Sequence, residues 1–309
     1  MDIPVIIFLC VFGAVLLITA YLLFGGYIAY KMTFYHDPKR DKPDPYRFVK
    51  NDGSERDELS RALISELLAV PFEDVYVRSH DGLLLHGYMH CEEKNEKVAI
   101  LLHGYKSTPF TDFSGGALLL MKLGYNIIMV DQRAHGLSEG NTLSFGALEH
   151  KDAVSWARFA EDTFGEGVPI ALVGVSMGAG TVVMAAREDM PRGVFAVVAD
   201  CPFSSAYDII KRVASTRMGI PAPIAMPIVR VGASLFGGFS LADAEPRVSA
   251  RELKIPLLLI HGEGDNFVPP EMSREIFEAG GALAALETFP DATHGTSFLY
   301  DREDRKSVV

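Results

Sequence analysis

A serine set between two glycines is the feature of this sequence that most directly suggests chemistry. Residues 174–178 read Gly-Val-Ser-Met-Gly and follow the apolar run 169–173. When a strand precedes such a pentapeptide and a helix follows it, the serine lies on a sharp, strained turn at the positive end of the helix. The glycine spacing differs from that of the common phosphate-binding loops. Ser176 is therefore the candidate nucleophile.

The next requirement is a base, because a serine hydroxyl near neutral pH is a weak nucleophile. His261 and His294 are the only histidines after Ser176. His261 ends an apolar run and is expected to pack in the core. His294 lies in a loop after the last predicted strand, from which it can reach Ser176. In this type of site the chain order is serine, acid, histidine, so His294 is the predicted base.

The acid that orients the base should lie at the end of a strand before His294. Asp265 follows the apolar run that ends in Gly262, and it would hold the imidazole and stabilise the imidazolium ion. Asp200 is an open alternative, since it ends the preceding strand, and Glu263 is a weaker one. Asp291 lies too near His294 and is interpreted as a turn residue.

Two backbone N–H groups should complete the site by binding the negative charge that develops on the substrate oxygen. One is the N–H of Met177, the residue after the serine. The other comes from the loop after the strand at 97–103, where either Tyr105 or Lys106 could donate. His103 begins this loop and is expected to hold it rather than act as a base.

The cysteines suggest neither a disulfide framework nor a metal centre. Cys10, Cys91 and Cys201 are far apart, odd in number, and lack the paired spacing of zinc ligands. We expect unpaired thiols and no metal.

The elements that position these residues alternate along the chain. A hairpin with a turn at Asp81–Gly82 is predicted first. Strands are then predicted at 97–103, 126–131, 169–174, 195–200, 256–262 and 286–290, with helices at 111–123, 146–164, 177–188 and 270–280. The central strands are continuous apolar runs, which is typical of a parallel sheet covered on both faces. The predicted class is α/β, with a mostly parallel central sheet flanked by helices.

Residues 203–250 interrupt this alternation. The apolar stretch of this segment, residues 218–240, is broken by Pro221, Pro223, Pro227 and Arg230, which argues against a second membrane span. The segment is predicted to be a short helical cap insertion over one end of the sheet. Two interpretations stay open, namely ordinary packing and a lid or apolar pocket wall.

The amino terminus carries a membrane signal. Residues 4–30 contain no charged residue, and about 20 apolar residues suffice to cross a bilayer core. The run is too long for a signal peptide and lacks a basic start. Positive charges follow the run but do not precede it: Lys31, Lys39, Arg40, Lys42, Arg47 and Lys50. The sequence thus predicts a single-pass transmembrane anchor at 4–30, in the cell membrane, with the catalytic domain in the cytoplasm.

Residues 31–71 are interpreted as a linker followed by an amphipathic helix. Ser54 and Asp57 form a capping pattern, and Leu63 and Leu67 lie on one apolar face. We favour packing of this face on the main domain, and a helix lying on the membrane is the alternative.

The motifs together resemble the α/β-hydrolase superfamily. The matching segments are LLHGY, VDQRAHGLSEG, GVSMG, HGEGDNFVP and THG, in this order over residues 73–300. More narrowly, the chain resembles membrane-tethered serine hydrolases described as esterases, lysophospholipases or monoacylglycerol lipases. The resemblance implies an α/β-hydrolase domain at 72–309, an eight-stranded sheet and no cofactor. It also implies that the second segment, with Asp131, Arg133, Gly136 and Ser138, shapes a loop near the site. The stretch after His294 is short for the closing helix that such proteins usually carry.

These observations predict a serine hydrolase that cleaves carboxylic esters, with a small acyl ester or a lipid as substrate. A peptidase or thioesterase would use the same groups, and a non-catalytic binding module is the alternative from another class. The formal net charge of −11 argues against a nucleic-acid partner, which would require a basic face.

Overall fold

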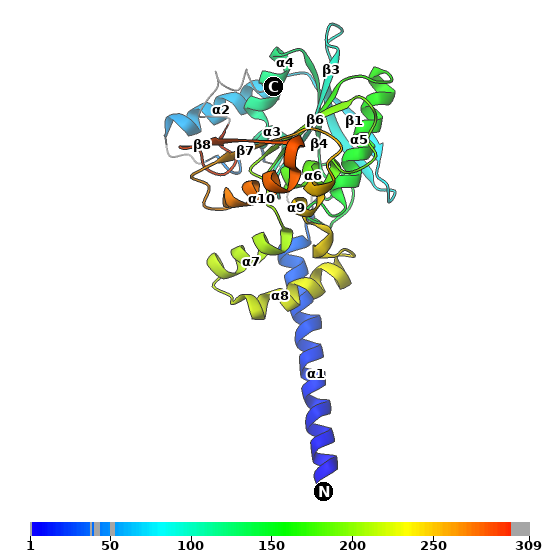
Figure 1. Cartoon of the computed structure of the whole chain (residues 1–309), viewed down its shortest axis with the longest axis vertical. Coiled ribbons are helices and arrows are strands. Elements are labelled where there is room, and N and C mark those ends of the chain that lie inside the picture. Colours follow the sequence, from blue (N-terminus) through cyan, green and yellow to red (C-terminus); the bar gives the residue numbers. More distant parts are fainter. Residues whose placement is uncertain (1, 38, 40–43, 50–52, 298–309) are drawn as a thin grey trace.

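Eight segments of the chain pair into one sheet, and helices cover both of its faces (Figure 1). The computed structural model describes residues 2–37, 39, 44–49 and 53–297. The strands are β1 (Glu73–Arg78), β2 (Leu84–His90), β3 (Lys97–Leu102), β4 (Tyr125–Val130), β5 (Ile170–Val175), β6 (Val194–Asp200), β7 (Leu257–Gly262) and β8 (Ala284–Phe289). Their order across the sheet is β1-β2-β4-β3-β5-β6-β7-β8.

The sheet is mostly parallel, as the apolar runs predicted. Only β1–β2 and β2–β4 pair antiparallel, and every pair from β4–β3 to β7–β8 is parallel. All six residues of β4 are buried. The hairpin turn is at Asp81–Gly82, where Gly82 adopts a φ of 93° that glycine accepts readily. The strand count agrees with the one that the family resemblance implied.

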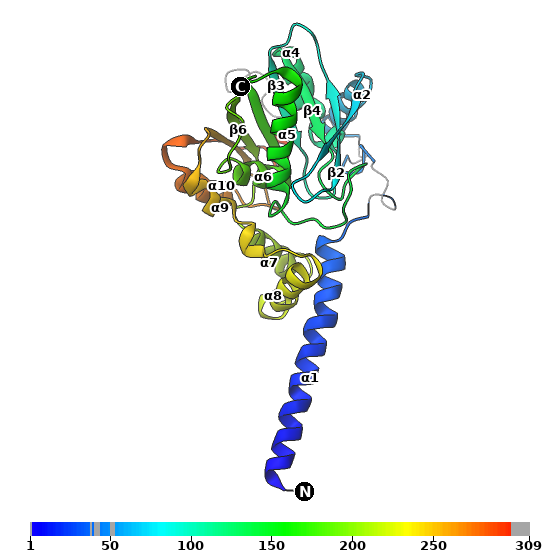
Figure 2. The same ribbon diagram turned by 90° about the vertical axis from the view of Figure 1, so that its right-hand side faces the viewer.

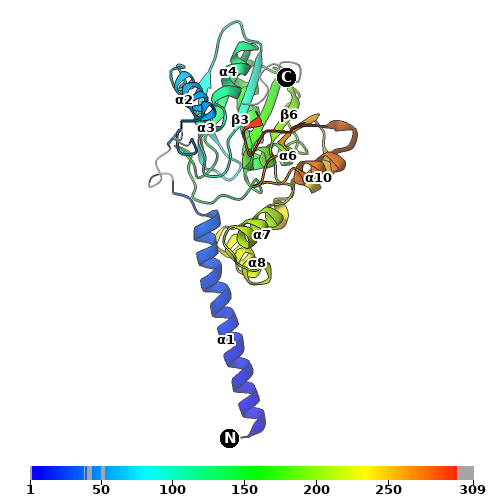
Figure 3. The ribbon, with the colours of Figure 1, turned by 90° about the vertical axis from the view of Figure 1, so that its left-hand side faces the viewer.

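The helices form two layers (Figures 2 and 3). α5 (Glu149–Phe164), α6 (Met177–Ala185) and α10 (Glu271–Gly280) pack on one face, in a core that includes the buried Trp156. α2 (Glu55–Leu68) and α4 (Ser114–Lys122) share the other core. The single helix expected at 111–123 is instead two, α3 (Pro109–Asp112) and α4, because Phe113 leaves helical angles with φ −113° and ψ 15°.

α2 begins at the capping residue that the sequence predicted. The Ser54 hydroxyl accepts a hydrogen bond from the Asp57 N–H at 3.3 Å. Leu63 and Leu67 are buried in the core that α2 shares with α4. The prediction that this apolar face packs on the main domain is therefore confirmed.

The amino-terminal helix projects away from the sheet (Figure 1). α1 (Ile3–Ala29) continues into a π-helical segment, Tyr30–Phe34. This 32-residue stretch has a mean hydropathy of 2.8 in its most apolar window, and none of that window is buried. Within the described part of the chain, it is the one helix long and apolar enough to cross a membrane. It is therefore the candidate for the predicted span.

The insertion at 203–250 is helical, as predicted. It holds α7 (Ala206–Thr216), α8 (Ala222–Val231), a π-helical segment (Gly232–Phe236), a 3-10 turn (Leu241–Asp243) and α9 (Pro246–Ser249). Figures 2 and 3 both show α7 and α8 beside the carboxyl-terminal end of α1. We call α7, α8 and Gly232–Phe236 the cap.

Some predictions concern parts of the chain that the structure does not describe. The stretch in which a short closing helix was considered falls mostly in residues 298–309, which lie outside the described residues. The same holds for Arg40, Lys42 and Lys50, three of the positive charges used to orient the anchor.

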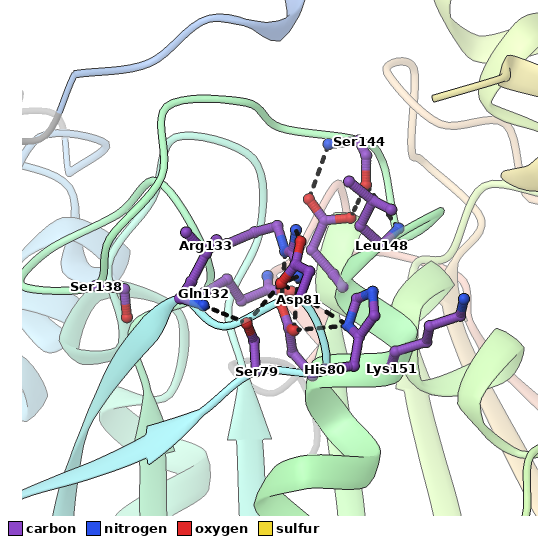
Figure 4. A network of polar contacts seen from close by, with 12 residues as sticks. Ser79, His80, Asp81, Gln132, Arg133, Ser138, Ser144, Leu148 and Lys151 are labelled. Carbon is purple, nitrogen blue, oxygen red and sulfur yellow. Dashed lines mark hydrogen bonds and ion pairs between the residues drawn. The ribbon is translucent and has the colours of Figure 1, made fainter. Parts of the chain in front are cut away.

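A buried arginine organises the loop that follows β4 (Figure 4). The Arg133 guanidinium donates two hydrogen bonds of 2.7 Å to Asp152 on α5, and further bonds to Asp81 at the hairpin turn. Burial raises the pKa of Asp81, but the hydrogen bonds from Arg133 and Ser79 outweigh this effect and lower it to about 2. The contacts tie the hairpin, this loop and α5 together, which fits the shaping role implied for Arg133.

Candidate active site

Ser176 lies on a strained turn between β5 and α6. Its backbone has φ 53° and ψ −110°, a conformation that a residue with a side chain rarely adopts. A side chain at Gly174 would overlap the backbone of Gly178, and one at Gly178 would overlap the Leu102 carbonyl group. The Ser176 N–H donates to the Asp200 carbonyl at 2.8 Å, which holds the turn against β6.

Three of the predicted side chains meet at this turn. The Nε2 atom of His294 lies 3.0 Å from the Ser176 hydroxyl oxygen, and its Nδ1 atom lies 2.7 Å from Oδ2 of Asp265. The Phe267 ring packs edge-on against the imidazole, with ring centres 5.0 Å apart. The contacts run from hydroxyl to imidazole to carboxylate, the arrangement that activates a serine.

The Asp265 carboxylate is buried and accepts several hydrogen bonds. Its Oδ1 atom accepts the N–H groups of Phe267 at 2.8 Å and Val268 at 2.9 Å. Burial alone would raise the pKa of Asp265, but hydrogen bonds from His261 and His294 hold it well below its ordinary value. The group therefore stays ionised at neutral pH.

His261 has a contact that the sequence did not indicate. Its side chain is buried, as expected, but Nε2 lies 3.3 Å from Oδ2 of Asp265 and 3.0 Å from the Val268 carbonyl oxygen. Nδ1 lies 2.6 Å from the Ser273 hydroxyl. Asp265 thus contacts two imidazoles, of which only that of His294 reaches Ser176.

The other acids have different partners. The Asp200 carboxylate accepts a hydrogen bond from the Ser297 hydroxyl at 2.9 Å. Glu263 accepts two bonds of 2.7 Å from Arg274. Asp291 is an exposed turn residue. In the part of the chain that the structure describes, the carboxylate hydrogen-bonded to His294 is that of Asp265.

The loop after β3 lies against the serine. A Cβ atom added to Gly104 would be 3.4 Å from the Ser176 Cβ, so the backbone of this loop approaches the hydroxyl closely. The Lys106 N–H donates to Nε2 of His135 at 3.1 Å. Of the two alternative donors that the sequence offered, the N–H of Lys106 is thus the one that has this partner.

Asp112 holds this loop, a role that its sequence context did not indicate. Oδ2 accepts the Gly104 N–H and Oδ1 accepts the Ser107 hydroxyl, both at 2.6 Å. Burial raises the pKa of Asp112, with these hydrogen bonds opposing the shift. Asp112 and His294 line the same cavity.

The histidines beside the loop are structural. His103 is buried, with Nδ1 2.8 Å from the Gly104 carbonyl oxygen, and its Nε2 accepts the Gln132 N–H at 3.2 Å. Burial lowers the pKa of both His103 and His135, so they remain neutral at physiological pH. The expectation that His103 holds the loop is confirmed.

Cys201 lies close to Asp265 and His294. Its sulfur, an Asp265 carboxylate oxygen and a His294 ring nitrogen lie within 4.8 Å of one another. Burial raises the pKa of the Cys201 thiol well above its ordinary value, which keeps it neutral. All three cysteines are unpaired.

Two cavities meet at Ser176. One, of about 310 Å³, has an almost wholly apolar lining and extends between α1 and the cap. The other, of about 510 Å³, is more polar and is lined by His294, Asp112 and Lys106. The nucleophile candidate is thus accessible from two chemically different sides.

The chain is similar to several known proteins. A model of a family described as the alpha/beta hydrolase family matches residues 99–306. The chain is 25% identical over 228 residues to the uncharacterized protein YqkD of Bacillus subtilis, a match that covers 74% of each protein. It is 21% identical over 236 residues to protein bem46 of Schizosaccharomyces pombe, covering 74% of this chain and 73% of that protein.

Among solved structures, the chain is similar to the esterase Pf2001 of Pyrococcus furiosus. The two are 25% identical, the TM-score is 0.62, and the match covers 79% of this chain and 90% of the esterase.

The turn at Ser176 generates a prediction about Gly178. We expect Gly178→Ala to destabilise the fold by several kcal/mol or prevent folding, because the added methyl group overlaps the Leu102 carbonyl. Gly116→Ala on α4 is the matched control, since its methyl group would come no closer than 3.8 Å to the atoms around it. Thermal unfolding in detergent measures both, and equal melting temperatures would contradict the prediction.

Proposed function

Because the chain belongs to the alpha/beta hydrolase family, we propose that it is a serine hydrolase that cleaves carboxylic esters through an acyl-enzyme on Ser176. The observation that carries the proposal is the hydrogen-bonded series Ser176–His294–Asp265, with distances of 3.0 and 2.7 Å. The similarity to an esterase from Pyrococcus furiosus supports an ester as the substrate.

In the first half of the reaction, Ser176 Oγ attacks the acyl carbonyl carbon while His294 Nε2 accepts the hydroxyl proton. The imidazolium then gives this proton to the leaving alcohol oxygen, and the acyl group stays on Ser176. Asp265 is ionised and accepts from His294 Nδ1, so it fixes the tautomer that leaves Nε2 free to act as the base.

The oxyanion of the tetrahedral intermediate is proposed to accept hydrogen bonds from the Met177 and Tyr105 N–H groups. Met177 begins α6, so its N–H lies at the positive end of the helix dipole. Removal of one such donor lowers kcat by roughly 10²–10³-fold in other hydrolases. The Asp112 bonds to Gly104 and Ser107 would hold this loop in position before substrate binds.

In the second half, a water molecule attacks the acyl-enzyme. His294 accepts a proton from this water and returns it to Ser176 Oγ as the acid product leaves. The same groups serve both halves, so neither a metal nor a cofactor is required by the proposal.

We further propose that α1 crosses the cell membrane once and that the rest of the chain is cytoplasmic. Its length and mean hydropathy support a span. Lys31 and Arg47 follow the span, whereas the residues before it carry no Lys or Arg, which favours an outside amino terminus.

Ser176→Ala should remove esterase activity, with a loss on the order of 10⁶-fold in kcat, because the nucleophile is absent. A fluorophosphonate probe should label the wild-type chain and fail to label this variant. Ser155→Ala is the control, since this α5 hydroxyl bonds only the Lys151 carbonyl among the described residues. Hydrolysis of short acyl esters by the Ser176 variant at the wild-type rate would contradict the proposal.

Asp265→Asn and Asp200→Asn form a matched pair that tests the acid. We expect Asp265→Asn to lower kcat by roughly 10⁴-fold, because an amide favours the wrong tautomer of His294. Asp200→Asn should lower kcat far less, since this carboxylate bonds Ser297. The measurement is steady-state hydrolysis of a soluble ester, and a larger loss for Asp200→Asn would assign the role to that residue.

The native cysteines allow the orientation to be tested. Cys91 is exposed on the sheet domain, Cys201 is buried, and Cys10 lies within α1. A membrane-impermeant maleimide should leave the chain unlabelled in intact cells and label it after permeabilisation. Cys91→Ser should abolish that label. Labelling of Cys91 in intact cells would reverse the proposed orientation.

A further inference from the structure

The apolar cavity beside Ser176 has one wall made by the candidate anchor helix. Ile28 and Ala29 of α1, and Met32 after it, line the cavity. Ile209, Val213 and Ala214 of α7 and Ile228 of α8 supply the opposite side, and Ser176 and Met177 lie at the inner end. The candidate anchor helix therefore forms part of the cavity beside Ser176, in addition to its proposed role as a tether.

α1 is held against the cap by close backbone contact. A Cβ atom on Gly26 would lie 2.7 Å from Val231 Cγ1, and one on Gly232 would lie 2.7 Å from the Gly26 carbonyl oxygen. A Cβ atom on Gly25 would likewise lie 2.9 Å from Ile228. Glycines on α1 and on the cap therefore allow these two elements to pack closely, as small residues do between membrane helices.

The segment after α1 is also fixed to the site. The Tyr105 hydroxyl donates to the Thr33 carbonyl oxygen at 2.8 Å. Phe34 is fully buried and packs edge-on against Phe145 and Phe239. The wall formed by α1 is thus continuous with the core that surrounds Ser176.

The position of His294 indicates which half of an ester enters this cavity. In the proposed mechanism His294 protonates the leaving alcohol, so the alcohol must leave on the side of the imidazole. His294 lines the polar 510 Å³ cavity and is not among the residues that line the apolar one. The acyl chain would therefore occupy the apolar cavity, whose lining suits a hydrocarbon chain.

If α1 is the proposed span, the mouth of the apolar cavity would lie near the membrane surface. Four of its lining side chains are exposed: Ile28 (41%), Met32 (54%) and Met218 (47%) belong to α1 and the cap region, and Phe267 (38%) lies beside His294. A hydrocarbon core takes about 20 helical residues, so a span that begins at Ile3 ends near Leu22. The Tyr21 hydroxyl donates to the Ile224 carbonyl oxygen at 2.8 Å, so the start of α8 lies at that level.

From these observations we propose that the last turns of α1 form one wall of the acyl site, and that the substrate is a single-chain lipid ester entering directly from the membrane. The proposal rests on the proposed esterase function. The shared chemistry of its substrates is one long acyl chain in ester linkage, held in a bilayer leaflet. Ile28 and Met32 are then residues that determine chain-length selectivity.

The test compares two tryptophan substitutions on the same helix in the full-length chain. Ile28→Trp places an indole at the cavity wall, whereas Ile18→Trp changes an exposed residue of α1 that does not line the cavity. Each protein is reconstituted in phosphatidylcholine vesicles and titrated with a short-chain fluorophosphonate to count active sites. The substrates are palmitoyl-glycerol and palmitoyl-lysophosphatidylcholine in the vesicles, and soluble p-nitrophenyl butyrate.

We expect Ile28→Trp to lower kcat/KM for palmitoyl esters by about tenfold or more, because a hydrophobic pocket discriminates by that factor for small changes in fit. Butyrate hydrolysis should fall much less than palmitoyl hydrolysis, since a short acyl group stays near Ser176. Ile18→Trp should change neither rate. Met32→Trp is a second wall variant that repeats the test if Ile28→Trp does not fold.

Loss of palmitoyl and butyryl hydrolysis in equal proportion, or loss of neither, would overturn the proposal. A wild-type protein that hydrolyses butyrate but neither palmitoyl ester would also overturn it. Preference of the wild type for one palmitoyl lipid supports it and identifies the head group. Failure of the esterase proposal itself would be seen separately, as butyrate hydrolysis that survives Ser176→Ala.

Discussion

The close approach of β3, β5 and α6 at Ser176 is the constraint on which the rest of the site depends. The turn exists only because Gly174 and Gly178 carry no side chains where the neighbouring backbone fills the space. Once the turn is formed, the hydroxyl stands at the amino end of α6 and faces the loop after β3. His294 and Asp265 can then be supplied from the ends of later parallel strands, because these ends lie along the same edge of the sheet.

Holding that edge in position requires several buried polar contacts that do no chemistry themselves. Asp112 fixes Gly104 on one side of the serine, and His261 contacts Asp265 on the other. Such groups must be paired when they are buried, since an unpaired polar group in the core destabilises the fold. The polar contacts around the site are therefore part of the fold and at the same time orient the groups proposed to react.

The sequence predicted the side chains that would meet at Ser176 better than it predicted their surroundings. A serine, an acid and a histidine that follow parallel strands must lie at one edge of the sheet, so chain order predicted that His294 and either Asp265 or Asp200 would lie near Ser176. The hydrogen bond between His294 and Asp265 is a contact that order alone could not decide. The hydrogen bond from the Lys106 N–H to His135, which bears on the choice between Tyr105 and Lys106, was not predicted, because no local pattern connects His135 with the loop. The role of Asp112 and the contact of His261 with Asp265 were missed for the same reason, because both are set by tertiary packing.

The anchor shows a further limit of sequence patterns, because an apolar helix looks the same whether it faces lipid or protein. Residues 4–30 predicted a span, but the hydropathy of the run did not show that its last turns pack on the cap, which follows much later in the chain. The pair Gly25–Gly26 was the available signal, since small residues permit close helix packing. A chain beginning after residue 34 would lack Ile28, Ala29 and Met32, and its apolar cavity would be open on that side. The helix that would hold the protein in the membrane would then also shape the cavity that receives the acyl chain, so location and selectivity would depend on one structural element.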